Sequence, residues 1–135
     1  YEATVASDSS AADVLLLAGA PPAPAAHLIR LQATGTQCSS TLDIQVSRPD
    51  HRRLVLPMRA YIENTAPAID PATQACLHRI VAHVIGHTIG LFQHSSNPAD
   101  LIYASPRAVA PTSADSATAL WLYHLGAGLS PSPRP

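Results

Sequence analysis

The first half of the chain alternates apolar and polar positions, a pattern typical of β-strands. In the segment 41–47, Leu42, Ile44 and Val46 fall on one face with polar side chains between them, which predicts a half-buried strand. The same sheet is expected to continue in short apolar runs at 13–18, 27–33, 54–56 and 59–62. Pro57 interrupts the last two runs, and proline in a sheet belongs at an edge or a bulge.

The polar residues of the segment 41–47 indicate where this strand lies in the sheet. Thr41, Asp43 and Gln45 would point away from the core. We expect such a strand to form an edge beside a cleft, where an extended peptide can add as a further strand.

A helix is predicted in the second half of the chain, with clear signals at both ends. Asp70 is a good N-cap, Pro71 suits the first helical position, and Gly90 can take the left-handed conformation that ends a helix. The apolar packing positions between them are Leu77, Ile80, Val81, Val84 and Ile85.

A shorter helix is expected after the proline-bounded loop 106–111. Ser113 or Asp115 would cap it, and Gly126 would end it. Its apolar residues, which we expect to pack on the sheet, are Trp121, Leu122 and Leu125. Residues 127–135, rich in proline, are expected to form a flexible tail.

Length and composition fit one domain spanning residues 1–135. A chain of 135 residues buries a core but has little room for a second one. The formal net charge of −1 argues against nucleic acid or an anionic membrane surface as a partner, and the apolar runs are too short to span a membrane. The pattern predicts an α+β fold, in which a small, mixed and twisted sheet packs on a helix and a C-terminal helix follows.

Three histidines stand around the predicted end of the first helix. His83 and His87 are four residues apart, so they lie about 40° apart around the helix axis and can reach one metal ion. A turn at Gly90 would bring His94 back towards them. Three neutral histidines with an open fourth position are typical of a catalytic zinc site, whereas a histidine pair alone is also common as packed or surface residues.

The run from His83 to His94 resembles the zinc signature of the metzincin peptidases, H-E-x-x-H-x-x-G-x-x-H. Residues 94–103 are similar to the matrixin pattern, in which His-Ser and a short loop precede Met-Tyr. The resemblance is weak before residue 41, good over 70–103 and fair in the last helix. It implies a metzincin-like fold, a zinc cofactor, hydrolysis of a peptide or protein substrate, and export from the cell. Zinc would polarise the scissile carbonyl and activate water.

The sequence departs from that family at three positions. Val84 replaces the catalytic glutamate and can neither accept nor donate a proton. Gln93 occupies the expected place of the third ligand, but His94 is the better candidate, because its distance to the following turn matches the family. Ile102 replaces the methionine that forms an apolar floor under the metal, next to Tyr103, the expected wall of the substrate pocket.

These departures leave three functions open. The first is a zinc endopeptidase with impaired or lost activity. The second is a non-catalytic peptide-binding module that keeps the cleft, with or without zinc. The third is a structural relic without zinc. Glu63, at the end of a predicted strand before the helix, and Asp100, in the loop before the turn, are the candidates to replace the missing glutamate, yet each is better explained as a loop or capping residue. The sequence predicts neither the substrate nor the oligomeric state.

Two further features concern the frame of the domain. Cys38 and Cys76 can form a disulfide in an oxidising compartment or be buried as small apolar residues. Metzincins carry a long helix before the inner strands, and no amphipathic helix is evident before Asp13. The domain is therefore expected to be reduced at its N-terminal side.

Overall fold

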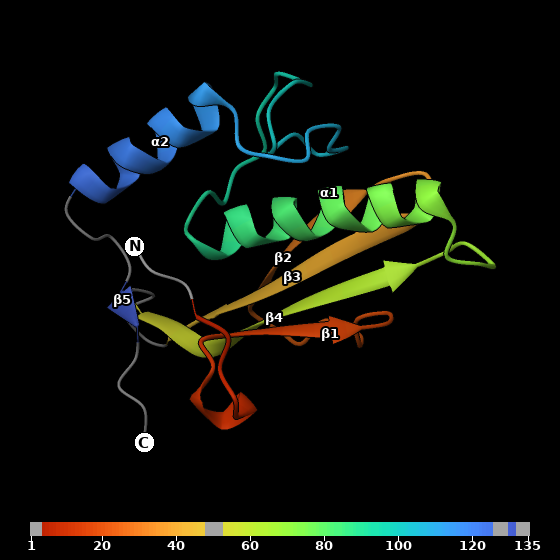
Figure 1. Cartoon of the computed structure of the whole chain (residues 1–135). Helices are drawn as coiled ribbons and strands as arrows, with labels where there is room; N and C mark the ends of the chain where they lie inside the picture. The colour runs from red at the N-terminus through yellow and green to blue at the C-terminus, as the bar shows by residue number, and fades with distance from the viewer. Residues whose placement is uncertain (1–3, 48–52, 126–129, 132–135) are drawn as a thin grey trace.

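A mixed β-sheet with one helix on its face forms the body of the molecule (Figure 1). The computed structural model describes residues 4–47, 53–125 and 130–131. The strands and helices are η1 (Ser9–Ala11), β1 (Val14–Ala18), β2 (Leu28–Thr34), β3 (Cys38–Val46), β4 (Arg53–Asn64), α1 (Pro71–Thr88), α2 (Ser113–His124) and β5 (Ser130–Pro131). The α+β class predicted from the pattern is confirmed.

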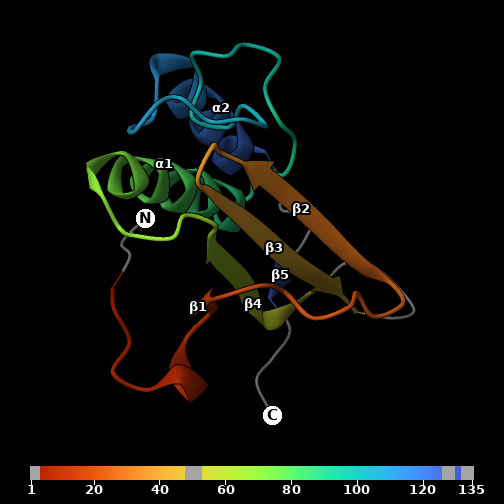
Figure 2. The same ribbon diagram turned by 90° about the vertical axis from the view of Figure 1, so that its right-hand side faces the viewer.

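The sheet has the order β1-β4-β3-β2, and β5 pairs with β4. β1 runs parallel to β4, whereas β3 is antiparallel to both β4 and β2. The expectation that 41–47 forms an edge is wrong, because β2 pairs along β3 and takes that edge (Figure 2). The polar residues Thr41 and Asp43 are buried instead, and Asp43 accepts hydrogen bonds from the guanidinium of Arg30 at 2.6 and 2.8 Å.

The two runs on either side of Pro57 belong to one strand, β4. Asp43 pairs with Arg59 and Gln45 pairs with Val55, so residues 56–58 stand opposite Ile44 alone. The regular pairing is interrupted at this irregularity, so Pro57, which has no N–H to donate to the ladder, fits in the strand here. The sequence predicts Pro57 at an edge or a bulge, and it lies at the irregularity in the pairing of β3 with β4.

Two clusters of buried side chains join α1 to the sheet. The first contains Leu42, Ile44, Met58, Ala60 and Val84, and the second contains Ala33, Cys38, Cys76 and Ile80. Val84 is only 1% exposed, so this residue is part of the core. A disulfide between Cys38 and Cys76 ties the start of β3 to α1, which decides between the two alternatives left open for these cysteines.

The ends of α1 follow the sequence signals. The Asp70 carboxylate accepts a hydrogen bond from the Thr73 amide at 2.7 Å, and Pro71 begins the helix. Gly90 has a φ of +105°, and two bonds close the end: Gly90 N–H to the His87 carbonyl at 3.0 Å and Leu91 N–H to the Gly86 carbonyl at 3.3 Å. This pair of bonds is the Schellman motif, which reverses the chain after a helix.

α2 lies on the side of α1 that faces away from the sheet (Figures 1 and 2), so the prediction that it packs on the sheet is wrong. Trp121 is 71% exposed and Leu125 57% exposed. α2 docks on the end of α1 through Tyr123, whose hydroxyl donates to the Ile89 carbonyl at 2.9 Å, and through Leu122. Hydrogen bonds join α2 to the end of α1 and to the loop between the two helices, and these contacts hold α2 away from the sheet.

The N-cap of α2 and part of the C-terminal tail differ from the predictions made from the sequence. Thr112 caps α2, with Asp115 as its capping-box partner. The helix ends at His124, and the predicted end at Gly126 lies outside the described residues. Of the tail predicted at 127–135, Ser130–Pro131 pairs with β4 as β5, and the other residues lie outside the described part.

Before β1, the described residues contain a single short helical turn, η1. None of the helices in the described ranges is both long and apolar enough to cross a membrane.

Replacing Cys38 and Cys76 together by alanine is expected to lower the free energy of unfolding by about 2–5 kcal/mol, because the unfolded chain loses its cross-link. The loss is measured by urea unfolding, with Ser9→Ala in an exposed turn as the control. A double variant as stable as the parent would show that the packing of α1 on the sheet does not need the covalent link.

Candidate metal centre

The structure brings His83, His87 and His94 together at the end of α1. Their available ring nitrogens all lie within 4.8 Å of one another. The ring centroids of His83 and His87 are 4.4 Å apart, and that of His94 is 5.3 Å from the first and 5.0 Å from the second. Nitrogens at the corners of a tetrahedral zinc site stand about 3.4 Å apart, as bonds of about 2.0–2.1 Å require, so small side-chain rotations fit the group to an ion.

His83 is fully buried, and only one of its two ring nitrogens has a hydrogen-bond partner. Its Nδ1 lies 2.8 Å from the carbonyl oxygen of Leu101. Because a carbonyl can only accept, Nδ1 carries the proton and Nε2 carries the lone pair. Nε2 is buried without a hydrogen-bond partner, and an unpaired polar atom in the interior is costly unless a ligand satisfies it.

His87 has the same arrangement, one turn further along α1. Its Nδ1 bonds the carbonyl oxygen of Leu91, so this imidazole also presents an unprotonated Nε2. That nitrogen lies 3.2 Å from Nε2 of His94. Backbone carbonyls that fix the second ring nitrogen are the usual supports of histidine ligands.

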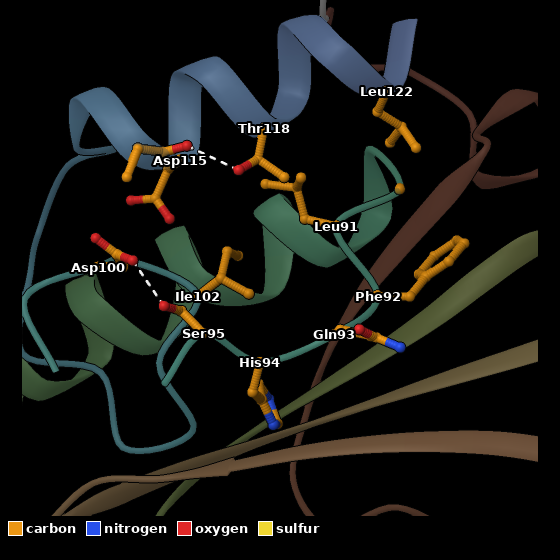
Figure 3. A pocket seen from close by; sticks show the side chains of 12 residues that line it. Leu91, Phe92, Gln93, His94, Ser95, Asp100, Ile102, Asp115, Thr118 and Leu122 are labelled. Carbon is orange, nitrogen blue, oxygen red and sulfur yellow. Dashed lines mark hydrogen bonds between the residues drawn. The ribbon is translucent and has the colours of Figure 1, made fainter. Parts of the chain in front are cut away.

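His94 reaches the pair because the Schellman turn reverses the chain at Gly90. Gln93, the other candidate for the third ligand, lines a neighbouring cavity, and its side chain leaves the chain in another direction (Figure 3). The metal-capable group found in the described residues contains His94 and not Gln93.

The three histidines resist protonation. Burial lowers the pKa of His83 and of His94, and it lowers the pKa of His87 to about 4. For His83, the bond to Leu101 opposes this shift but does not cancel it. The imidazoles are therefore neutral at pH 7, the state in which histidine binds a metal.

The turn after His94 packs beneath the histidines. Ile102 is 4% exposed, and its side chain touches the position where Gly86 lacks a Cβ. Its carbonyl accepts from the Ser95 amide at 2.9 Å, which closes the turn. Ile102 thus packs against α1 beside His87, while Tyr103 is half-buried next to it and pairs with Ser95 in a short bridge.

Asp115 on α2 supports this turn, a role that sequence reasoning missed. It is 6% exposed, and its carboxylate accepts from the Leu101 amide at 2.8 Å and from Thr112. Burial alone would raise the pKa of Asp115, but the hydrogen bonds from Thr112 and Leu101 outweigh it and lower the pKa. The capping pattern Thr112-x-x-Asp115 was visible in the sequence, whereas the contact with Leu101 was not.

No carboxylate of the described residues joins the three histidines. Glu63, at the end of β4, accepts from the hydroxyl of Ser39 at 3.4 Å. Asp100 is buried and accepts from Ser95 at 2.7 Å, from Asn97 and from Thr112. Both carboxylates thus have other partners, as expected for capping and loop residues.

The comparisons with known proteins give no relative for this arrangement. No family model, curated protein or solved structure matches the chain. The group itself, three neutral imidazoles with two backbone-anchored rings, can hold a divalent transition metal, and imidazole suits zinc among several others.

Acidification is expected to destabilise the metal-free protein between about pH 6.5 and 4. An unfolded histidine has a pKa near 6.5, while the folded pKa values are lower. Protons therefore bind the unfolded chain better, and stability falls as pH falls through this window. Urea midpoints measured in a chelator from pH 7 to 4.5 test this, with His87→Gln expected to flatten the dependence.

The control for that series is His78→Gln, at an exposed position of the same helix. It is expected to keep the pH dependence of the parent. If the urea midpoint of the parent does not change between pH 7 and 4.5, the conclusion that the imidazoles are buried in the neutral form is wrong.

Proposed function

We propose that His83, His87 and His94 bind zinc, and that the chain is a matrixin-like metzincin domain of the zinc endopeptidase type. The observation that carries the metal site is the buried Nε2 of His83, which has no partner in the described part of the chain and lies beside two further neutral imidazoles. A bound ion gives this nitrogen the partner that the protein does not supply.

The surroundings of the histidines support zinc. Two rings donate Nδ1–H to backbone carbonyls, which fixes their tautomers and aims Nε2 at one point. The third histidine is on a loop, and the fourth position stays open for a substrate group, as in catalytic sites. Zinc bound there supplies Lewis acidity towards a peptide carbonyl and towards water.

Hydrolysis is proposed to be impaired or lost. Proton transfer in such a reaction needs a carboxylate beside the metal, and removing a general acid–base typically slows a reaction by about 10²–10⁴-fold. Val84 takes that position in the motif and is buried in the core, while Glu63 and Asp100 have other hydrogen-bond partners. The substrate of any remaining activity would be a peptide or protein.

A second candidate function is a non-catalytic peptide-binding module, favoured by the edge strand β2. The amide of Thr34 bonds Ala104 at 3.4 Å and its carbonyl accepts from Ser105 at 2.8 Å, so both backbone groups point away from β3. Because orientation alternates along a strand, Gln32 and Arg30 also turn their backbone groups to this edge. An extended peptide can pair there.

The disulfide supports export from the cell, because such bonds persist mainly in oxidising compartments. Secretion is thus part of the proposal.

The purified protein is expected to contain close to one zinc per chain. The double variant His83→Ala/His87→Ala is expected to lose that zinc, since it removes two of the three nitrogens. Elemental analysis measures both, and thermal unfolding with added zinc should show a rise in Tm for the parent alone, because the ion binds only the folded chain.

The matched control for the zinc experiment is His78→Ala, an exposed histidine of the same helix. It is expected to keep the parent's zinc content. Zinc no higher in the parent than in the double variant, even after zinc is offered, would overturn the zinc site and the peptidase function, and would leave a binding module without zinc or a structural relic.

Val84→Glu is expected to lower the free energy of unfolding by about 3 kcal/mol or more and to create no peptidase activity, because it buries a carboxylate among apolar side chains. Urea unfolding and cleavage of a fluorogenic peptide library, both with zinc present, measure this. Val84→Ala separates the loss of packing from the cost of the charge.

Peptidase activity in Val84→Glu would support descent from an active zinc peptidase. Zinc-dependent cleavage by Val84→Glu would show that α1 can turn position 84 towards the metal, in contrast to the arrangement seen here.

A further inference from the structure

A cavity of about 500 Å³ lies between α2 and the segment that follows α1 (Figure 3). It adjoins the metal centre only through His94, and neither His83 nor His87 lines it. Its volume falls in the range of small-molecule sites, about 300–1,000 Å³. The proposed zinc function makes no use of this space.

The two ends of the cavity differ in chemistry. Asp100, Asp115 and Ser95 stand at one end, with the two carboxylates turned towards each other, and Phe92 and Leu122 stand at the other (Figure 3). This division fits a ligand that has one polar head and one apolar stem.

The polar end of the cavity carries two carboxylates, and neither forms an ion pair within the described residues. Asp100 is 7% exposed and Asp115 6% exposed, and the residues that line the cavity include no lysine or arginine. The hydrogen-bond donors to these carboxylates are neutral amides and hydroxyls. Two nearby carboxylates of low exposure attract a positive charge more strongly than exposed ones do.

One hydroxyl is shared between the two acids. Thr112 Oγ1 lies 3.0 Å from an oxygen of Asp100 and 2.9 Å from an oxygen of Asp115. A hydroxyl has a single proton to donate, so Thr112 can donate to only one of the two carboxylates at a time. A donor entering from the cavity would serve the carboxylate to which Thr112 does not donate.

We propose that this cavity binds an organic cation, a primary ammonium on an apolar stem, with the ammonium beside Asp100 and Asp115. The apolar stem would lie against Phe92 and Leu122. The source of the ammonium is either a lysine side chain of a protein or a small free amine, and both share this chemistry.

Binding is tested on the full chain in a chelator, so that the result does not depend on zinc. The probes are benzylamine, benzyl alcohol and benzoate, which have similar shape and differ in charge, and N-acetyl-lysine-N-methylamide as the side-chain form. Amide chemical shifts followed by NMR give each dissociation constant at pH 7.5.

Benzylamine or the lysine derivative is expected to bind at least about tenfold more tightly than benzyl alcohol, because charge-assisted hydrogen bonds are stronger than neutral ones. Benzoate should not bind, and added salt should weaken the amine. The tighter of the two amines identifies the source. Equal binding of amine and alcohol, or no saturation by either amine, would overturn the proposal.

Two variants locate the site. Asp100→Asn is expected to weaken amine binding about tenfold, with the remote Asp8→Asn as its matched control. Thr118→Leu adds volume at the cavity wall without removing a carboxylate, and Ala117→Leu, exposed on the same helix and outside the cavity lining, is its control. Unchanged amine binding in both Asp100→Asn and Thr118→Leu would overturn the assignment to this cavity.

Discussion

The packing of α1 on the sheet is the contact on which the rest of the structure depends. Ile80 and Val84 face the sheet from α1, and successive residues of a helix are turned by about 100°. His83 therefore cannot face the sheet as Val84 does, and it points sideways into the segment that follows the helix. The direction of His83 is thus a consequence of which residues α1 buries against the sheet.

The same packing shows what the residue at position 84 contributes to this chain. A valine there adds to the apolar contacts with Leu42 and Ile44, and burying such a side chain contributes roughly 1.5–3 kcal/mol. Stability and acid–base chemistry make opposite demands on this position, and the chain has the residue that favours stability.

Features that depend on the conformational preferences of neighbouring residues could be predicted from the sequence. The caps of α1, the irregular pairing at Pro57 and the approach of His94 each depend on a residue with one strong conformational preference, or on a fixed spacing along a helix. The interior place of β3 and the docking of α2 were not predictable in this way. They depend on which surfaces meet: β2 covers the polar edge of β3 through Arg30, and α2 attaches to the end of α1 rather than to the sheet. Asp115 was predicted only as a possible cap, and its bond to the backbone amide of Leu101 was missed because a backbone partner leaves no mark in the sequence.

The close approach of Gly86 and Ile102 has a consequence for how this chain can vary. Glycine within a helix costs about 1 kcal/mol relative to alanine, yet a Cβ at position 86 would meet the end of the Ile102 side chain. Ile102 follows Leu101, whose carbonyl orients His83. The volumes at positions 86 and 102 are thus linked: a larger residue at one needs a smaller one at the other to keep the histidine in place. The two positions behave as one packing unit, 16 residues apart along the chain.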